Sequence, residues 1–337
     1  MNVTDSLTVA RLRLVGITIG VLAVLGAVLS GIFDVDLSRL ITRGFVTRSL
    51  EMATPITLAA IGGLYAEKSG VFNIGLEGFM IFGAFTTAGT MFALGGTSPT
   101  QGDVWVAILV AIVVSTLLTA VFAVLLIRYK ADQIVAGLAV WFVGLGFAPF
   151  VAALVWGSRS SPGLTSIDKL AFGQSPLVFL TIVVVGVAWV FLFRTRYGYW
   201  VQAAGENPEA LDTAGVDVNR VRYATVIFSG AMAGFGGAVL LAHAGNFVGT
   251  GSTMVDGRGW IAIVAYLFGN YNPVGAAAAA LLFGALDMLN VQFQTVGIEI
   301  SARLVNLLPY VAVLVVLTAY GKTRIPAVVG EPYETEE

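Results

Sequence analysis

The stretch EKSGVFNIGLEGFMIFGAF, residues 67–85, decides how this chain must be built. It places charged side chains, an asparagine and several glycines inside sequence that is otherwise apolar enough to lie in lipid. Such polar groups are costly beside acyl chains, so the backbone here must pack inside protein or line a polar cavity. Glu67 and Lys68 fit a solute pathway and a solvated cytoplasmic turn equally well. For Asn73 and Glu77 we favour a pathway, because glycine-broken helices expose backbone dipoles to a solute in many transporters.

Composition excludes a soluble globular domain. The 337 residues have a mean hydropathy of +0.89 and include 57% hydrophobic and 11% charged residues, whereas soluble domains carry about 25% charged residues. The net charge of −2 and the scattered Lys and Arg give no basic surface for nucleic acid. Without Cys, and with His243 as the single histidine, the chain lacks disulfides, thiolate nucleophiles and His or Cys metal sites. We expect a polytopic membrane protein with no cofactor, no metal and no catalysis of its own.

Apolar windows predict about ten membrane spans in an all-α bundle. They fall at roughly 14–33, 46–66, 70–94, 104–127, 133–156, 176–193, 223–243, 257–270, 274–292 and 303–320. The window 257–270 is shorter than the about 20 residues that a span needs, so it could be re-entrant. The windows 46–66 and 70–94 could also form one broken element. We expect a single transmembrane domain over residues 1–325 and an acidic, disordered tail over 326–337.

The distribution of Lys and Arg predicts that both termini are cytoplasmic. With the N-terminus inside, 11 of the 18 basic residues fall in inner segments, as the positive-inside rule requires. The bias is clearest in RYKAD, residues 128–132, and in the Arg-flanked loop 194–222. We therefore expect a multi-pass membrane protein with both termini inside.

A weak internal echo relates residues 70–85 to RGWIAIVAYLFGNYNPVGAA, residues 258–277. Both are hydrophobic elements that glycine interrupts, and both contain an aromatic-Gly pair. Short interrupted elements in corresponding halves are typical of transporter repeats with a binding site between them. Chance similarity in a chain rich in Gly and Ala is the alternative.

The loop 194–222 contains a complete short helix signal. Asn207 is a good N-cap, Pro208 suits the first helical position, Glu209 suits the first turn and Gly215 suits the C′ position. The predicted helix, 208–214, is too short to be stable alone in water, so it needs a partner surface. It offers a small apolar face made of Ala210, Leu211 and Ala214. That face could dock on the chain's own spans or on a soluble motor, and we favour the motor.

Polar residues also interrupt the ninth window. Asp287 and Asn290 are three apart and so share one helix face. A carboxylate inside a span is a functional hypothesis by default. The two side chains could hydrogen-bond the hydroxyls of a sugar, or they could pair with a neighbouring helix.

Further polar and aromatic residues surround the connection after the seventh window. His243, Asn246, Asp256 and Arg258 are expected in this outer connection, where they could meet an external binding protein through charge complementarity. An ordinary wet loop is the alternative. Trp260 falls near a span end, so we interpret it as an interfacial anchor.

Three separated motifs resemble one known family. They are AEKSGVFNIGLEGFM (66–80), GENPEALDTAGVDVNRVRYATVIFSGAMAGFGGAVL (205–240) and GRGWIAIVAYLFGNYNPVGA (257–276). Together they resemble the permease subunits of ABC importers in the branched-chain amino acid, ribose and nucleoside group, and look most like the nucleoside and simple-sugar permeases. The likeness extends in order over most of residues 45–320. The amino acid permeases lack so close a match to EKSGVFNIGLEG, which favours nucleosides or sugars.

The resemblance also implies functional residues. It assigns coupling to an ATPase to Gly205, Asn207, Pro208, Glu209, Ala214 and Gly215, and Leu211 joins them from the apolar face of the same predicted helix. The Asn-Ile-Gly-x-Glu-Gly element corresponds to residues 73–78. For the substrate pathway we select Asn73, Gly75, Glu77, Asp287 and Asn290.

The resemblance implies a transmembrane permease subunit of an ATP-driven importer, which moves nucleosides or simple sugars across the plasma (inner) membrane. No GxxxxGK[ST] motif is present, so ATP hydrolysis would belong to a separate cytoplasmic ATPase. The other expected partners are a second, non-identical permease, an extracytoplasmic solute-binding protein, the small-molecule substrate and membrane lipid. Two alternatives stay open: an ABC permease for branched-chain amino acids, and an ion-coupled secondary transporter in which Glu77 or Asp287 titrates or binds the ion. A membrane enzyme would need clustered catalytic groups that the sequence lacks.

Overall fold

The computed structural model describes residues 42–296 and 324–334. In these residues the structure is all-α, and the strand-like pairing within them is one isolated bridge between Ala171 and Gln174. The helices are α3 (Arg43–Lys68), α4 (Leu76–Gly95), α5 (Gln101–Ile127), α6 (Gln133–Trp156), α7 (Pro176–Arg194), α8 (Arg196–Glu206), α9 (Pro208–Thr213), α10 (Val218–Ala244), α11 (Arg258–Phe268) and α12 (Pro273–Val296). The windows 14–33 and 303–320 lie outside the described residues, so the total of ten spans stays a prediction, as does the cytoplasmic position of the termini.

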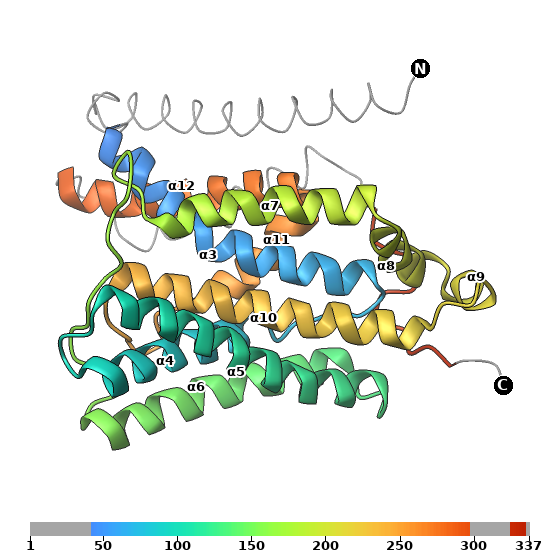
Figure 1. Cartoon of the computed structure of the whole chain (residues 1–337), viewed down its shortest axis with the longest axis horizontal. Coiled ribbons are helices and arrows are strands. Elements are labelled where there is room, and N and C mark those ends of the chain that lie inside the picture. Colours follow the sequence, from blue (N-terminus) through green and yellow to red (C-terminus); the bar gives the residue numbers. More distant parts are fainter. Residues whose placement is uncertain (1–41, 297–323, 335–337) are drawn as a thin grey trace.

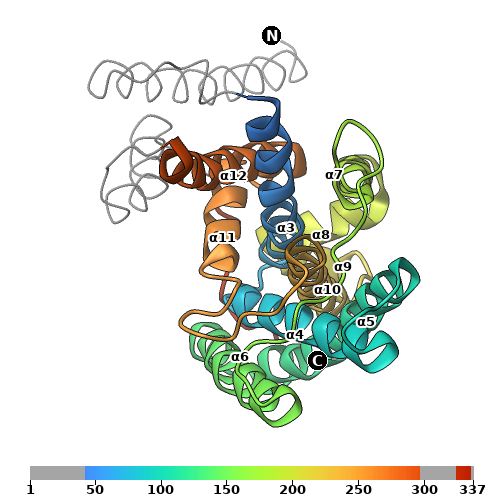
Figure 2. The ribbon, with the colours of Figure 1, turned by 90° about the vertical axis from the view of Figure 1, so that its left-hand side faces the viewer.

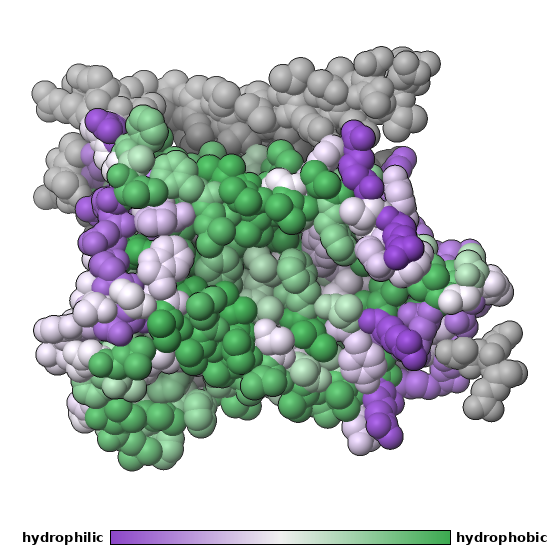
Figure 3. All heavy atoms as spheres, in the orientation of Figure 1, coloured by the Kyte–Doolittle hydropathy of each residue, from purple (hydrophilic) through white to green (hydrophobic). Residues whose placement is uncertain are grey.

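Five of the described helices are long and apolar enough to cross a membrane, namely α4, α5, α6, α7 and α10. They run along the long dimension of the molecule (Figure 1). The surface in the same view has a hydrophobic band between two more hydrophilic ends (Figure 3). Such a band matches the hydrocarbon core of a bilayer. We call the end that carries α8, α9 and residues 324–334 the inner end, because its charges predict a cytoplasmic position, and the opposite end the outer end.

The centre of the bundle is formed by α3 and α10. α10 packs against α3, α4 and α5, while α3 also packs against α11 and α12. Viewed from the outer end, α7 and α5 lie on one side with α10 between them, and α11 and α6 lie on the other side (Figure 2).

Glycines allow the central helices to approach closely. A Cβ atom on Gly83 of α4 would collide with the backbone of Gly234 in α10, and one on Gly237 would collide with the carbonyl of Met80. In lipid, helices associate through such close packing rather than through a hydrophobic drive. The glycine-rich α10 is accordingly buried along most of its length.

Gly83→Ala is expected to destabilise the bundle by about 1–3 kcal/mol, because the added methyl group forces α4 and α10 apart. The matched control is Gly89→Ala in the same helix, where an added Cβ would have no neighbour within 4 Å. The measurement is the Tm of each variant in detergent, determined from the size-exclusion profile after heating. Equal Tm values for the two variants would contradict the close approach of α4 and α10.

Two irregular segments lie inside this bundle. Residues 69–75 join α3 to α4, and Gly70 takes a φ of +92°, which favours glycine. The other segment, 245–257, precedes α11. α11 has 11 residues and a length of about 16 Å, too short for a span. The windows 46–66 and 70–94 thus form two separate helices, α3 and α4. The window 257–270 forms a helix that is too short to cross a membrane.

Candidate functional site

The two irregular segments meet at Glu77. The Glu77 side chain, which is 2% exposed, accepts hydrogen bonds from the backbone N–H of Gly257 at 2.8 Å and of Gly259 at 2.6 Å. These N–H groups stand at the N-terminus of α11, where helical partners are missing and the helix dipole is positive. A Cβ on Gly259 would collide with the backbone of Glu77. The first turn of α4 therefore caps α11 through a buried carboxylate.

Asn73 and Gly75 shape the entry into α4. The Asn73 side-chain amide donates to Ser229 Oγ at 2.5 Å, and its oxygen accepts from Gly75 N–H at 3.0 Å. Gly75 is the N-cap residue of α4. The structure thus brings together three of the five predicted pathway residues, and buries all three. Their role in the pathway stays a prediction.

Arg258 links Glu77's neighbourhood to Asp287. An Arg258 guanidinium nitrogen lies 3.2 Å from Asp287 Oδ2, and the two side chains are 17% and 26% exposed. Arg258 is the first residue of α11, directly after Gly257, which Glu77 binds. Asp287 therefore pairs with a neighbouring helix, as one of the two alternatives predicted. The side chain of Asn290, the fifth predicted pathway residue, lies outside the described part of the chain.

The position of Arg258 differs from its expected place in the outer connection. The chain re-enters the bundle over residues 253–257, which include the buried Val255, before α11 begins. Sequence reasoning therefore missed Arg258 as a site residue. The signal was present in Gly257-Arg258-Gly259, two glycines around a cation ahead of an apolar run too short to span.

Aromatic side chains lie next to this junction. Trp260 packs against Trp141 of α6 with ring centroids 5.5 Å apart and planes at 88°. Both tryptophans are half-buried, and Asp256, two residues before α11, is exposed. Trp260 therefore contacts another helix of the bundle, and its role as an interfacial anchor stays a prediction. The junction offers aromatic faces, a cation and carboxylates within one region.

Glu67 and Lys68 close the inner side of this region. Tyr271, in the turn between α11 and α12, donates its hydroxyl to Glu67 Oε1 at 2.6 Å, and Lys68 Nζ lies 5.4 Å from the Tyr271 ring centroid. Burial, and then the Glu67 carboxylate, raise the pKa of the Tyr271 phenol above its ordinary value, so the phenol is the donor. Glu67 is buried, which contradicts the alternative of a fully solvated turn.

The short inner-end helix forms as predicted, except that its last residue is Thr213 instead of Ala214. Asn207 Oδ1 accepts from Ala210 N–H at 3.0 Å, and Pro208 is the first residue of α9. Gly215 has a φ of +81°. After it, Val216 N–H reaches Leu211 O at 3.3 Å, which closes the helix in a Schellman motif.

The predicted apolar face of α9 is divided between two surroundings. Leu211 is buried in a small cluster with Ala204 and Val218, so it docks on this chain itself. Glu209, Ala210, Thr213 and Ala214 are exposed. Gly205 packs so closely on the Lys68 carbonyl that a Cβ would collide with it. α9 is thus anchored on the rest of the chain through Leu211, and its exposed side is left for a partner.

The sequence predicted no helix before Asn207, but α8 occupies Arg196–Glu206. Its glycines and aromatic residues have low helix propensity, which hides it. The usable signal was Thr195, whose hydroxyl accepts from Gly198 N–H at 3.2 Å as an N-cap.

Residues 324–334 lie against α9 and the start of α10 at the inner end. The composition predicted part of these residues to be disordered. Arg222, which is 3% exposed, donates from Nε to Ser69 O at 3.1 Å and from Nη1 to Glu331 O at 2.8 Å. Tyr333 donates its hydroxyl to Asp212 Oδ2 at 2.8 Å, and Lys130 pairs with Glu334. Between α9 and this segment lies an open groove of about 800 Å³, lined by Glu206, Glu209, Asp212, Glu331 and Glu334 among others.

Neither region has the geometry of a metal site. Over residues 42–296 and 324–334, no group of three or more His, Asp or Glu side chains could hold a metal ion. The junction presents charged groups, an amide and aromatic faces, which are the groups that a site for a polar solute uses.

Comparison with known proteins places the chain in a family. Residues 45–317 match the family model for the permease component of branched-chain amino acid transport systems. The guanosine ABC transporter permease protein NupQ of Bacillus subtilis is 34% identical over 86% of this chain and 95% of its own. The nucleoside ABC transporter permease protein NupC of Lactococcus lactis is 35% identical over 86% and 96%. The putative glucose ABC transporter permease protein TsgC13 of Haloferax volcanii is 32% identical over 77% and 80%.

No solved structure matches the chain. The relatives are permease subunits of ABC transporters, which favours this class over an ion-coupled secondary transporter. Together with the apolar helices, they indicate a multi-pass protein of the plasma membrane. The resemblance that three motifs indicated is confirmed, and the chain belongs to the family of permease components of branched-chain amino acid transport systems.

Proposed function

We propose that this chain is one permease subunit of an ATP-driven importer of nucleosides. The observation that carries the proposal is the pair of relatives named for guanosine and nucleoside transport, which the chain matches over nearly their whole length. A simple sugar is the second candidate, because a relative named for glucose transport is almost as similar.

The solute pathway in this proposal runs past the N-terminus of α11. A nucleoside has a planar base and a hydroxylated sugar. The half-buried Trp260 offers a ring face on which a base could stack. Asp287 and Arg258 supply charged groups for the hydroxyls. Glu77, Asn73 and Gly75 would hold this surface in place from behind rather than touch the solute.

The proposed assembly contains further subunits. A cytoplasmic ATPase docks on the exposed face of α9, around Glu209 and Ala214. A second, non-identical permease completes the pathway on the side of α6 and α11. An external binding protein delivers the solute to the outer end. His243, which hydrogen-bonds Ser175 at 2.7 Å, and the neighbouring Asn246 belong to that end.

The test is uptake of labelled nucleosides in cells with and without the gene, competed by free sugars and branched-chain amino acids. ATP depletion and a protonophore are applied separately. Gene-dependent uptake that follows ATP and yields only to nucleosides supports the proposal. Competition by glucose alone would support the sugar instead, and uptake that collapses with the protonophore at constant ATP would overturn the ATP-driven mechanism.

Trp260→Ala is expected to raise the KM for nucleoside uptake by up to about tenfold, because a lost aromatic stacking contact costs about 0.5–1.5 kcal/mol. Trp260→Phe should keep most of the affinity. The matched control is Trp105→Ala, since Trp105 is 37% exposed near the outer end of α5. A KM that is the same in Trp260→Ala and Trp105→Ala would remove Trp260 from the pathway.

A further inference from the structure

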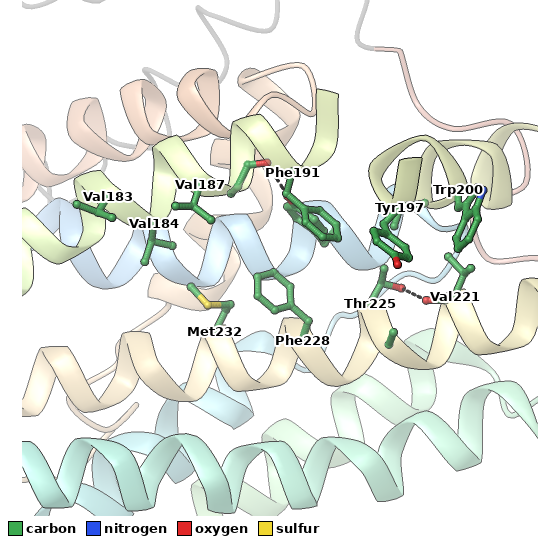
Figure 4. Close-up of a pocket in the computed structure, with 14 residues that line it drawn as sticks. Val183, Val184, Val187, Phe191, Tyr197, Trp200, Val221, Thr225, Phe228 and Met232 are labelled. Atoms are coloured by element: carbon green, nitrogen blue, oxygen red, sulfur yellow. Dashed lines mark hydrogen bonds between the residues drawn. The ribbon is translucent and has the colours of Figure 1, made fainter. Parts of the chain in front are cut away.

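An apolar groove separates α7 and α8 from α10. It has a volume of about 640 Å³, and none of the described residues that line it is charged. Val184, Val187 and Phe191 of α7 form one wall, and Phe228 and Met232 of α10 form the other (Figure 4). Tyr197 and Trp200 of α8 close its inner end. A volume of this size lies within the range of small-molecule sites in proteins.

The groove opens on the surface that faces lipid. Val183 and Val187, at its edge, are 59% and 62% exposed. It lies on the side of the bundle where α7 and α5 flank α10, opposite α11 and α6 (Figure 2). The surrounding surface in that direction is hydrophobic (Figure 3). The groove is therefore separate from the junction at Glu77 and from any permease that packs against α11 and α6.

One exposed arginine, Arg196, contacts two rings at the inner end of the groove, and a second, Arg194, is exposed two residues before it at the C-terminus of α7. The Arg196 guanidinium lies 4.8 Å from the ring centroid of Tyr197 and 5.8 Å from that of Trp200, both of which line the groove. Arg194, at the C-terminus of α7, lies 5.5 Å from the Trp189 ring centroid. In the described part of the chain, no carboxylate lies within ion-pair distance of either guanidinium. Neutral rings leave the positive charge uncompensated, so both side chains can still bind an anion.

We propose that this groove is a binding site for an anionic phospholipid of the inner leaflet. One acyl chain lies between α7 and α10, and the phosphate contacts Arg194 and Arg196. The apolar walls account for the chain and the arginines account for the negative head group, which basic residues at the cytoplasmic surface attract. Aromatic residues at the same level are typical of the membrane interface. A bound lipid would then fill the space between α7 and α10 beside α8, which leads into α9.

The test uses the full chain purified from its membrane in detergent, stripped of lipid and mixed with equal amounts of dioleoyl phosphatidylglycerol and dioleoyl phosphatidylcholine. Native mass spectrometry counts bound lipid. We expect at least a tenfold preference for phosphatidylglycerol, and its loss in Arg194→Gln/Arg196→Gln. The control pair Arg128→Gln/Arg220→Gln, also exposed at the inner end, should keep it. Equal retention of the two lipids, or equal loss in the control pair, would overturn the site.

A second pair of variants tests the groove itself. Val187→Trp should fill it and displace the lipid while both arginines remain. Val190→Trp on the same helix, where Val190 is exposed but does not line the groove, should not. Because the chain has no Cys, Val187→Cys also allows a clean cross-linking control. A high-yield disulfide to a cysteine placed within residues 14–33, or to a second copy, would show that protein occupies the groove and would overturn the proposal.

Discussion

Glu77→Ala is expected to abolish uptake and to lower the Tm of the permease sharply. The substitution removes the acceptor of two backbone N–H groups at the buried start of α11. A buried donor left without a partner costs about 1–3 kcal/mol, and hydrogen bonds to charged groups are the stronger ones. Two such donors therefore cost several kcal/mol, a large part of the about 5–15 kcal/mol that stabilises a typical protein. The same change disconnects the first turn of α4 from α11.

The comparison variants for this prediction are Glu77→Gln and Glu51→Ala. The glutamine keeps one carbonyl acceptor but turns an amide toward the second N–H, so its Tm should be intermediate. Glu51 lies 3.3 Å from Lys169, which is 56% exposed, and such a pair contributes at most about 1 kcal/mol. Uptake and Tm are measured for all three variants at matched expression. A Glu77→Ala variant with unchanged Tm and lost uptake would argue against the capping role and for direct contact with the solute.

Glu209→Arg together with Ala214→Trp is expected to abolish binding of the ATPase and, with it, uptake. Both side chains are exposed beside the buried Leu211. The double variant therefore changes the exposed side of α9 and leaves Leu211, which anchors the helix, intact. A reversed charge and a bulky ring at the centre of a docking face each cost several-fold to many-fold in affinity. Co-purification of the ATPase with the permease measures the loss, and an unchanged Tm shows that the permease is folded.

The matched control for this pair lies at the opposite end of the molecule. Asp168→Arg together with Gly163→Trp makes the same kinds of change at two exposed positions of the outer end. This control should retain the ATPase. Retention of the ATPase by Glu209→Arg/Ala214→Trp would mean that the ATPase docks elsewhere.

Local signals explain which parts of this structure could be predicted. The caps of α9 were readable because Asn207, Pro208 and Gly215 act on their own backbone neighbours. The apolar windows likewise predicted α5, α6 and α7 to within a few residues, since a bilayer imposes the length of a span.

Long-range contacts explain what the sequence left open. Glu77 and Gly257 are 180 positions apart. No local sequence pattern predicts that a carboxylate at the start of one helix caps a distant helix. The pairing of Arg258 with Asp287 depends on the chain's re-entry before α11, which moved the arginine from the expected outer connection into the bundle. The acidic composition of the tail alone predicts disorder. Residues 324–334 pack instead because the buried Arg222 donates to the Glu331 carbonyl, a long-range contact.

The contact between Tyr333 and Asp212 can form only some time after α9 has been synthesised. The two residues are 121 positions apart in the chain, and a ribosome adds about 5–20 residues per second. Roughly 6 to 24 seconds therefore pass between the synthesis of α9 and the synthesis of the residues that brace it. A nascent chain carries α9 without its brace throughout that interval. If α9 receives the ATPase, a chain can meet it with the Tyr333 contact in place only after residue 333 has been synthesised.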